Sequence, residues 1–85
     1  MTYDARRAVQ PLSPVEAAVA KNFADVLGVR VATADADFFD LGGNSLQLMK
    51  LRNRVQPELG VQTALSRMFE APSVRDIATI LAEAP

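Results

Sequence analysis

The chain has 85 residues, of which 49% are hydrophobic and 22% are charged, and its formal net charge is −1. These values predict one small soluble globular domain, and they argue against a disordered chain or a strongly basic surface that binds nucleic acid or anionic lipid. The lack of any cysteine or histidine excludes disulfides, metal sites built from those residues, and the Ser-His and Cys-His pairs of many enzymes.

Residues 1–12 mix charged and small side chains, which indicates a flexible leader or linker ahead of a folded domain at 13–84. This segment lacks the apolar stretch of a signal peptide, and no apolar run approaches the ~20 residues that span a bilayer. We therefore expect a cytoplasmic protein without membrane contact.

The first helix is predicted to begin at Ser13. The sequence Ser13-Pro14-Val15-Glu16 combines a capping serine, a proline at the first helical position and a glutamate three residues after the serine, which is typical of a capping box. Gly28 is a typical C-terminal stop. Between them apolar residues recur at helical spacing: Val15, Ala18, Val19, Phe23, Val26 and Leu27.

The next segment, 29–44, is long for a connection in so small a domain, and long ordered loops are often functional. We expect its aromatic pair, Phe38-Phe39, to anchor the loop onto the core. Acidic residues on an exposed loop usually cap neighbouring helices or are solvated, so we favour that role over a magnesium site. The acids concerned are Asp35, Asp37 and Asp40.

A second helix is predicted from Ser45, with Asn44 as its N-cap. Pro57 should end or bend this helix near Gln56, because proline lacks an N–H donor and clashes with the preceding turn. The inner stripe of the helix is expected to contain Leu48, Leu51, Val55 and Leu59.

Two further helical segments follow. Residues 64–70 are expected to form one or two turns, with Leu65 and Phe69 as an apolar pair. Ser73 and Asp76 predict a second capping box for a last helix, whose inward residues are Val74, Ile77, Ala78 and Leu81. No segment alternates like a strand, so the predicted fold class is all-α: a small four-helix bundle of three longer helices and one short third helix, with a long first loop.

Ser45 is the candidate functional residue. It lies in the first turn of a predicted helix, where backbone N–H groups lack intrahelical partners and the helix dipole is positive, so an anion attached to its hydroxyl is favoured. Gly42 and Gly43 precede it, and glycines allow the close approach of another backbone or a ligand. Taken alone, however, two glycines before a helix more often form only a turn.

The wider segment closely resembles the attachment site of carrier proteins, D-x-F-F-x-L-G-G-x-S-L, which here spans Asp37 to Leu46. The sequences P-L-S-P-V-E at the first helix and F-E-A-P-S-V before the last helix resemble the same family. The resemblance covers nearly all of residues 11–82, and it implies the four-helix fold of acyl carrier proteins.

The resemblance also implies a covalent 4′-phosphopantetheine group on Ser45, joined from coenzyme A by a separate phosphopantetheinyl transferase that uses magnesium. Gly42, Gly43, Asn44 and Leu46 would surround the attachment point. The thiol of the arm would hold substrates as thioesters, which suits a chain without any thiol of its own. By this resemblance the chain is a carrier without catalysis, and it is a substrate of the transferase.

Within that family, the double glycine and the two phenylalanines resemble the peptidyl carrier, or thiolation, domains of nonribosomal peptide synthetases, which serve antibiotic and other secondary metabolism. Fatty-acid carriers usually have an aspartate before the serine and an acidic second helix, whereas this chain has Asn44, followed by Lys50, Arg52 and Arg54. Carriers of polyketide or hybrid pathways and aryl carriers are the alternatives. The implied partners of a monomeric carrier are the transferase and adenylation, condensation, thioesterase or tailoring enzymes.

The candidate docking residues are Met49, Leu46 and Met68. At about 100° per residue, Met49 and Leu46 lie beside Ser45 and away from the inner stripe of the helix. Methionine adapts to several partners, which favours docking for Met49, whereas a wide buried face explains Leu46 more simply. Met68 is expected to join Met49, since similar carriers meet their partners through these two helices.

Two rival interpretations come from other classes. One is a helical protein-interaction module without a prosthetic group, in which the glycines form only a turn. The other is a small DNA-binding bundle that uses Lys50, Arg52 and Arg54. The slightly acidic net charge argues against DNA binding, and a solvated helix surface explains the basic residues more simply.

Overall fold

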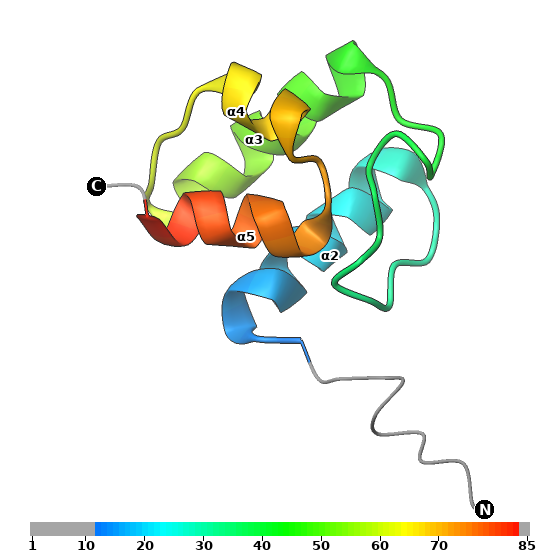
Figure 1. Ribbon diagram of the computed structural model, residues 1–85, viewed down its shortest axis with the longest axis horizontal. Coiled ribbons are helices and arrows are strands. Elements are labelled where there is room, and N and C mark those ends of the chain that lie inside the picture. Colours follow the sequence, from blue (N-terminus) through cyan, green and yellow to red (C-terminus); the bar gives the residue numbers. More distant parts are fainter. Residues whose placement is uncertain (1–11, 84–85) are drawn as a thin grey trace, which may run out of the picture.

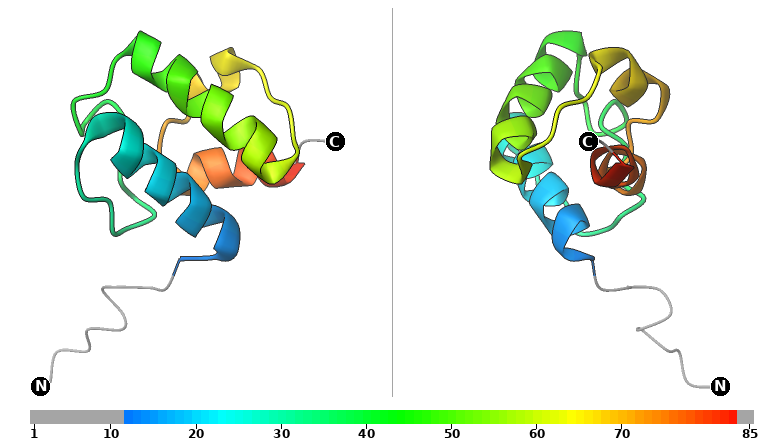
Figure 2. Two further views of the ribbon diagram at one scale, coloured as in Figure 1. Left: turned by 180° about the vertical axis from the view of Figure 1, so that it is seen from behind. Right: turned by 90° about the vertical axis from the view of Figure 1, so that its left-hand side faces the viewer.

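The structure is a computed structural model, and it describes residues 12–83. These residues form four helices and no named strand: α2 (Pro14–Leu27), α3 (Ser45–Leu59), α4 (Leu65–Glu70) and α5 (Val74–Glu83). Figures 1 and 2 show α2 and α3 side by side and antiparallel, with α5 packed against α2 and the short α4 bridging α3 and α5. The predicted all-α fold with one short helix is confirmed.

No helix among residues 12–83 is both long enough and apolar enough to cross a membrane.

The first predicted helix has the expected ends. The Ser13 hydroxyl accepts a hydrogen bond from the Glu16 N–H at 3.1 Å, and the Glu16 carboxylate accepts one from the Ser13 N–H at 2.8 Å. At the other end Gly28 has a φ of 69° and donates its N–H to the Ala24 carbonyl, a conformation that strongly favours glycine. The capping box and the glycine stop of α2 are both confirmed.

Helix α3 does not end near Gln56, so the expectation that it ends there is wrong. It continues through Pro57 to Leu59. A proline in the last turn removes one hydrogen bond donor but leaves the following carbonyls free to be capped. Gly60, with a φ of 70°, supplies that cap, and the N–H groups of Gly60 and Val61 both donate to the Gln56 carbonyl in a Schellman-type ending.

The hydrophobic core receives side chains from all four helices and from the long loop. The predicted inward residues of α5 are buried, as are those of α3 except Leu59, which is only partly buried. The fully buried hydrophobic residues are Val19, Phe23, Phe38, Leu48, Leu51, Val55, Met68, Val74 and Ile77. The core is therefore continuous from α2 to α5.

A polar contact joins α2 to α3 at the edge of this core. Asn22 is 1% exposed, and its side-chain NH₂ donates to the Ala18 carbonyl at 2.8 Å. Its oxygen accepts a hydrogen bond from Arg54 Nε at 3.0 Å, and the same guanidinium pairs with Asp25 at 2.9 Å. Arg54 thus donates a hydrogen bond to a buried amide oxygen, so its guanidinium has a structural role within the bundle.

The long loop 28–44 is tied to the start of α5 by backbone hydrogen bonds. The Val74 and Arg75 N–H groups donate to the carbonyls of Ala36 and Ala34, at 3.0 and 2.9 Å. The Phe38 N–H donates to the Pro72 carbonyl at 2.9 Å. The loop therefore supplies acceptors that the first turn of α5 cannot find within its own helix.

Phe38 anchors this loop in the core, as predicted for the aromatic pair. Its side chain is 0% exposed, and its ring meets Phe23 edge-on, with ring centres 5.1 Å apart. The Phe39 ring lies edge-on to the Phe38 ring, with ring centres 5.9 Å apart, and is only partly buried. One aromatic side chain of the pair fills the core, while its neighbour lies near the surface.

The change Phe38→Ala should lower the free energy of unfolding by about 3–5 kcal/mol, because it removes a fully buried ring and leaves a cavity. Phe39→Ala is the matched control, and it should cost about 1 kcal/mol because that ring is only partly buried. Urea unfolding followed by circular dichroism measures both values. Equal losses would contradict the assignment of Phe38 as the anchor.

Candidate functional site

Ser45 is the first residue of α3, and it is exposed. Asn44 caps the helix: its side-chain oxygen accepts the Gln47 N–H at 2.9 Å, and the Gln47 side chain accepts the Asn44 N–H at 3.0 Å. This reciprocal box confirms Asn44 as the N-cap. The backbone N–H groups of Ser45 and Leu46 belong to the turn that precedes the first intrahelical bonds, so they are available to an anion.

The two glycines before Ser45 have different roles. Gly42 has a φ of 98°, a conformation that other residues rarely adopt. Gly43 packs against Phe38: a Cβ atom there would lie against the Phe38 ring and 2.7 Å from the Phe38 carbonyl oxygen. Because Gly43 has no side chain, Phe38 of the same loop can lie directly against its backbone.

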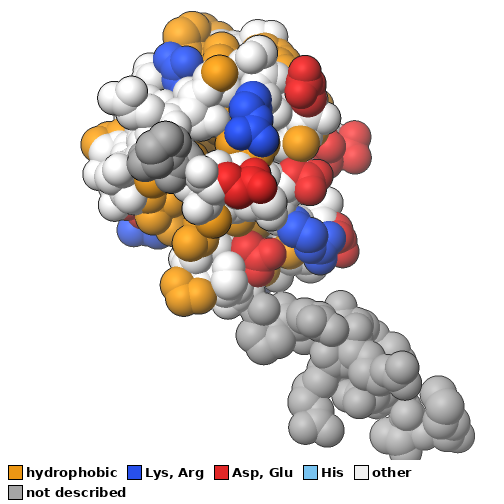
Figure 3. Space-filling model, turned by 60° about the vertical axis from the view of Figure 1, so that its left-hand side comes forward, with side chains coloured by type: hydrophobic (Ala, Val, Ile, Leu, Met, Phe, Trp, Pro, Cys, Tyr) orange, Lys and Arg blue, Asp and Glu red, His pale blue; other side chains and the backbone are white. Residues whose placement is uncertain are grey.

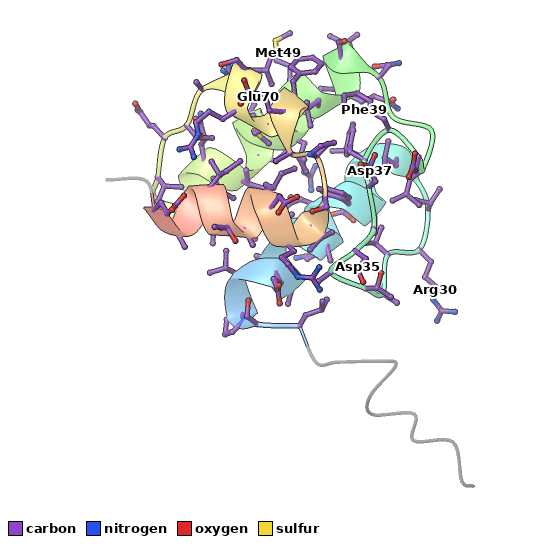
Figure 4. The ribbon with its side chains drawn as sticks, viewed as in Figure 1. Arg30, Asp35, Asp37, Phe39, Met49 and Glu70 are labelled. Carbon is purple, nitrogen blue, oxygen red and sulfur yellow. The ribbon has the colours of Figure 1, made fainter. Side chains whose placement is uncertain are left out.

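Two of the three acidic residues of the loop have structural partners, namely Asp37 and Asp35. The Asp37 carboxylate accepts hydrogen bonds from the N–H groups of Phe39 and Asp40 at 2.9 and 3.0 Å, which holds the turn that leads to Gly42. Asp35 pairs with Arg75 on α5, and this contact raises the pKa of Arg75. Figure 4 shows Asp35 and Asp37 at separate places on the loop, and residues 12–83 contain no group of three acids arranged to hold a metal ion.

Three exposed apolar side chains lie on α3 and α4. Leu46 is 58% exposed, Met49 is 37% exposed and Phe69 is 39% exposed. Figure 4 shows Met49 at the outer surface of α3. The Phe69 ring stacks on Phe39, with ring centres 5.7 Å apart and planes 20° apart. We call Leu46, Met49 and Phe69 the apolar patch.

The structure corrects two expectations about these helices. Met68 is 0% exposed, so its assignment to the docking surface is wrong. The buried role favoured for Leu46 is also wrong. In the six-residue α4, Met68 fills the core while Phe69 is exposed. A helix this short can direct only part of its surface inward, so one of two adjacent large apolar residues must face out.

Phe69 is the site residue that sequence reasoning missed. The available signal was the pair of adjacent large residues, Met68-Phe69, on a helix predicted to have only one or two turns. Its stacking partner, Phe39, is 30 positions earlier in the chain, and no local pattern connects the two. The contact therefore required the tertiary structure.

Charged side chains do not form a single basic surface on the face drawn in Figure 3, where acidic and basic groups are interspersed. Of the three basic residues on α3 that could have contacted DNA, Arg54 is engaged with Asp25 and Asn22. Lys50 lies in an open groove between α2 and α3, where Asp25 is also part of the lining. Over residues 12–83, this distribution lacks the electrostatic footprint of a nucleic-acid interface.

Comparison with known families gives one clear match. The profile of the family described as "Phosphopantetheine attachment site" matches residues 17–81. The chain is 44% identical over 73 residues to CymA of Salinispora arenicola, a probable non-canonical nonribosomal peptide synthetase, and the match covers 86% of this chain but 1% of CymA. It is 40% identical over 76 residues to surfactin synthase subunit 1 of Bacillus subtilis, covering 89% of this chain and 2% of that protein.

Solved structures have the same fold. One similar chain comes from a structure of the phosphopantetheine transferase Sfp in complex with coenzyme A and a peptidyl carrier protein, with a TM-score of 0.80, 31% identity, and coverage of 87% of this chain and 96% of that one. Another is a nonribosomal PCP domain, with a TM-score of 0.73, 37% identity, and coverage of 84% and 91%. In both comparisons the similarity extends over most of this chain and most of the solved chain.

The cap of α3 can be tested separately from any chemistry at Ser45. Asn44→Ala should lower the free energy of unfolding by about 1 kcal/mol, because the Gln47 N–H loses its acceptor. Asn53→Ala, an exposed asparagine within the same helix, should change stability by less than about 0.5 kcal/mol. Urea denaturation compares the two, and an equal loss in both variants would contradict the capping role.

Proposed function

Because this chain belongs to the family of proteins with a phosphopantetheine attachment site, we propose that Ser45 carries the group and that the chain serves as a thiolation domain of a nonribosomal peptide synthetase. The chain is a peptidyl carrier domain, and its prosthetic group is covalent 4′-phosphopantetheine. The observation that carries the assignment to Ser45 is its exposed hydroxyl in the first turn of α3, after a glycine turn held by a buried phenylalanine.

The reaction that loads Ser45 requires little from the chain. Ser45 Oγ forms a bond to the phosphorus of the phosphopantetheinyl moiety, the phosphoanhydride bond of coenzyme A breaks, and adenosine 3′,5′-bisphosphate leaves. The hydroxyl proton passes to a base on the transferase, because this chain has no histidine or cysteine and no basic side chain contacts Ser45 among the described residues. The chain contributes an accessible oxygen at a rigid position.

The residues around Ser45 fit a phosphate group. The resulting phosphodiester is an anion, and the N-terminus of α3 favours a negative charge by about 0.3–1 kcal/mol at an exposed position. The Ser45 and Leu46 N–H groups point out of the first turn, while Asn44 and Gln47 cap each other. When bound, the prosthetic group supplies the thiol that holds aminoacyl or peptidyl intermediates as thioesters.

The chain acts in this proposal as a substrate and a carrier, without catalysis of its own. Its partners are the transferase and the adenylation, condensation, thioesterase or tailoring enzymes that act on the loaded arm. The apolar patch, Leu46, Met49 and Phe69, is the surface by which these enzymes recognise it, since exposed apolar side chains beside a functional residue are typical of interaction sites. Met49 adapts its shape readily.

Loading of Ser45 is tested by incubating the chain with coenzyme A, magnesium and a phosphopantetheinyl transferase, followed by intact-protein mass spectrometry. The wild-type chain should gain one phosphopantetheinyl mass, and Ser45→Ala should gain none. Ser66→Ala is the matched control, because Ser66 is also an exposed serine in the first turn of a helix. A folded wild-type chain that stays unmodified, or a Ser45→Ala variant that is still modified, would contradict the proposal.

The corrected docking surface makes opposite predictions for two apolar residues. Leu46→Ala should leave the free energy of unfolding within about 0.5 kcal/mol of wild type, because that side chain is exposed, while it slows loading by the transferase. Met68→Ala should lower the free energy of unfolding by about 2–5 kcal/mol, because that side chain is buried. Urea denaturation and loading rates measure both effects. Slower loading by folded Met68→Ala, with Leu46→Ala unaffected, would contradict this surface.

A further inference from the structure

Arg52 lies at a surface pocket that none of the site residues described above forms. The pocket has a volume of about 490 Å³, lies between α3 and the segment that leads to α4, and is lined by Arg52, Gln56, Gln62, Thr63 and Ala64. Its lining contains one cation, no acidic side chain, and neutral polar groups. The Gln56 side-chain oxygen accepts the Thr63 N–H at 2.8 Å, which leaves the NH₂ of Gln56 as a donor.

Arg52 differs in its surroundings from the arginines of residues 12–83 that form ion pairs. Arg54, Arg67 and Arg75 pair with Asp25, Glu83 and Asp35. Within residues 12–83, Arg52 Nε is buried and has no hydrogen-bond partner. A buried donor without an acceptor costs free energy, and a guanidinium has a planar set of donors that matches a carboxylate in two parallel hydrogen bonds.

The Arg52 pocket continues the face of α3 that carries Ser45. Arg52 and Gln56 follow Ser45 by seven and eleven positions, so at 100° per residue all three lie on one side of the helix. Arg52 is about 10 Å from Ser45 along the helix axis. A protein interface of ordinary size covers about 800 Å² on each partner, equivalent to a disc of about 16 Å radius, so an enzyme centred on Ser45 covers Arg52 as well.

We propose that the Arg52 pocket binds an Asp or Glu side chain of the phosphopantetheinyl transferase that modifies Ser45. This inference rests on the proposed function. The transferase is the partner of choice because it must reach Ser45 Oγ itself, whereas enzymes that act on the distant thiol need not cover this face of α3. A carboxylate provides the acceptors that Arg52 lacks in the free chain, and Gln56 can donate a further hydrogen bond.

Binding of a partner carboxylate gives a function to an arginine whose buried Nε lacks a hydrogen-bond acceptor in the free chain. In the free chain the buried Nε of Arg52 opposes folding, and turning the side chain toward a carboxylate of the partner relieves this cost. Residues that serve binding at some expense of stability are common in functional sites. A purely structural arginine would do the opposite, since its removal would destabilise the chain.

The test compares Arg52→Gln with Lys50→Gln in steady-state loading by the transferase. Both changes remove one positive charge from α3, but Lys50 lies in the groove toward α2 and does not line the Arg52 pocket. Arg52→Gln should raise the KM for the carrier about tenfold, equivalent to about 1.4 kcal/mol, with kcat unchanged. Lys50→Gln should leave KM within about twofold of wild type, and Arg52→Lys should give an intermediate value because it keeps the charge without the fork.

Two further measurements separate the possible outcomes. The urea midpoint of Arg52→Gln should equal or exceed that of wild type, and salt should raise the KM of wild type more steeply than that of Arg52→Gln. Equal KM values for Arg52→Gln and Lys50→Gln, or a KM increase that accompanies loss of stability, would overturn this proposal while loading of the wild-type chain still supported the proposed function. A wild-type chain that is not loaded would overturn both.

Discussion

The burial of Phe38 against Gly43 is the contact on which the position of the site depends. The Phe38 ring is fully buried and meets Phe23 of α2, so the loop is fixed to the first helix of the bundle. Gly43 has no side chain, and its backbone can therefore lie directly against this ring. The chain then leaves the core within two residues and exposes Ser45 at the start of α3.

The loop is also held from two other directions. Its backbone carbonyls accept the first N–H groups of α5, and Phe39 stacks on Phe69 of α4. Each of the helices other than α3 thus contacts the segment that precedes Ser45, and α3 begins where that segment ends. A long loop without regular structure can be rigid when its backbone polar groups and large side chains all find partners.

Within residues 12–83, the result is a site that consists of an exposed surface around Ser45. Ser45 is exposed, Leu46 and Met49 on the same helix and Phe69 on α4 present apolar area, and the capping box of α3 completes the local hydrogen bonding. Such an arrangement suits a residue that must enter the active sites of other proteins. In the proposed function, the chain presents an oxygen at a fixed place and the reaction belongs to the partner.

Much of this protein follows from local sequence. The caps at Ser13 and Asn44, the glycine end of α2, the inner stripes of α3 and α5, and the placement of Ser45 were predictable because each depends on residues within one or two turns of one another. The end of α3 was not: one missing donor at Pro57 was outweighed by the Gly60 cap. The sequence by itself thus determined the helices and the candidate serine.

Only the tertiary structure decided which apolar residues face solvent. Leu46 and Phe69 are exposed and Met68 is buried because the short α4 covers only part of α3, and helical periodicity cannot state what packs against each face. The same holds for the Phe39–Phe69 stack and the Arg52 pocket, which join residues from separate elements. Side chains acquire these surroundings only when distant segments meet, so the candidate serine could be found from sequence while the surface around it could not.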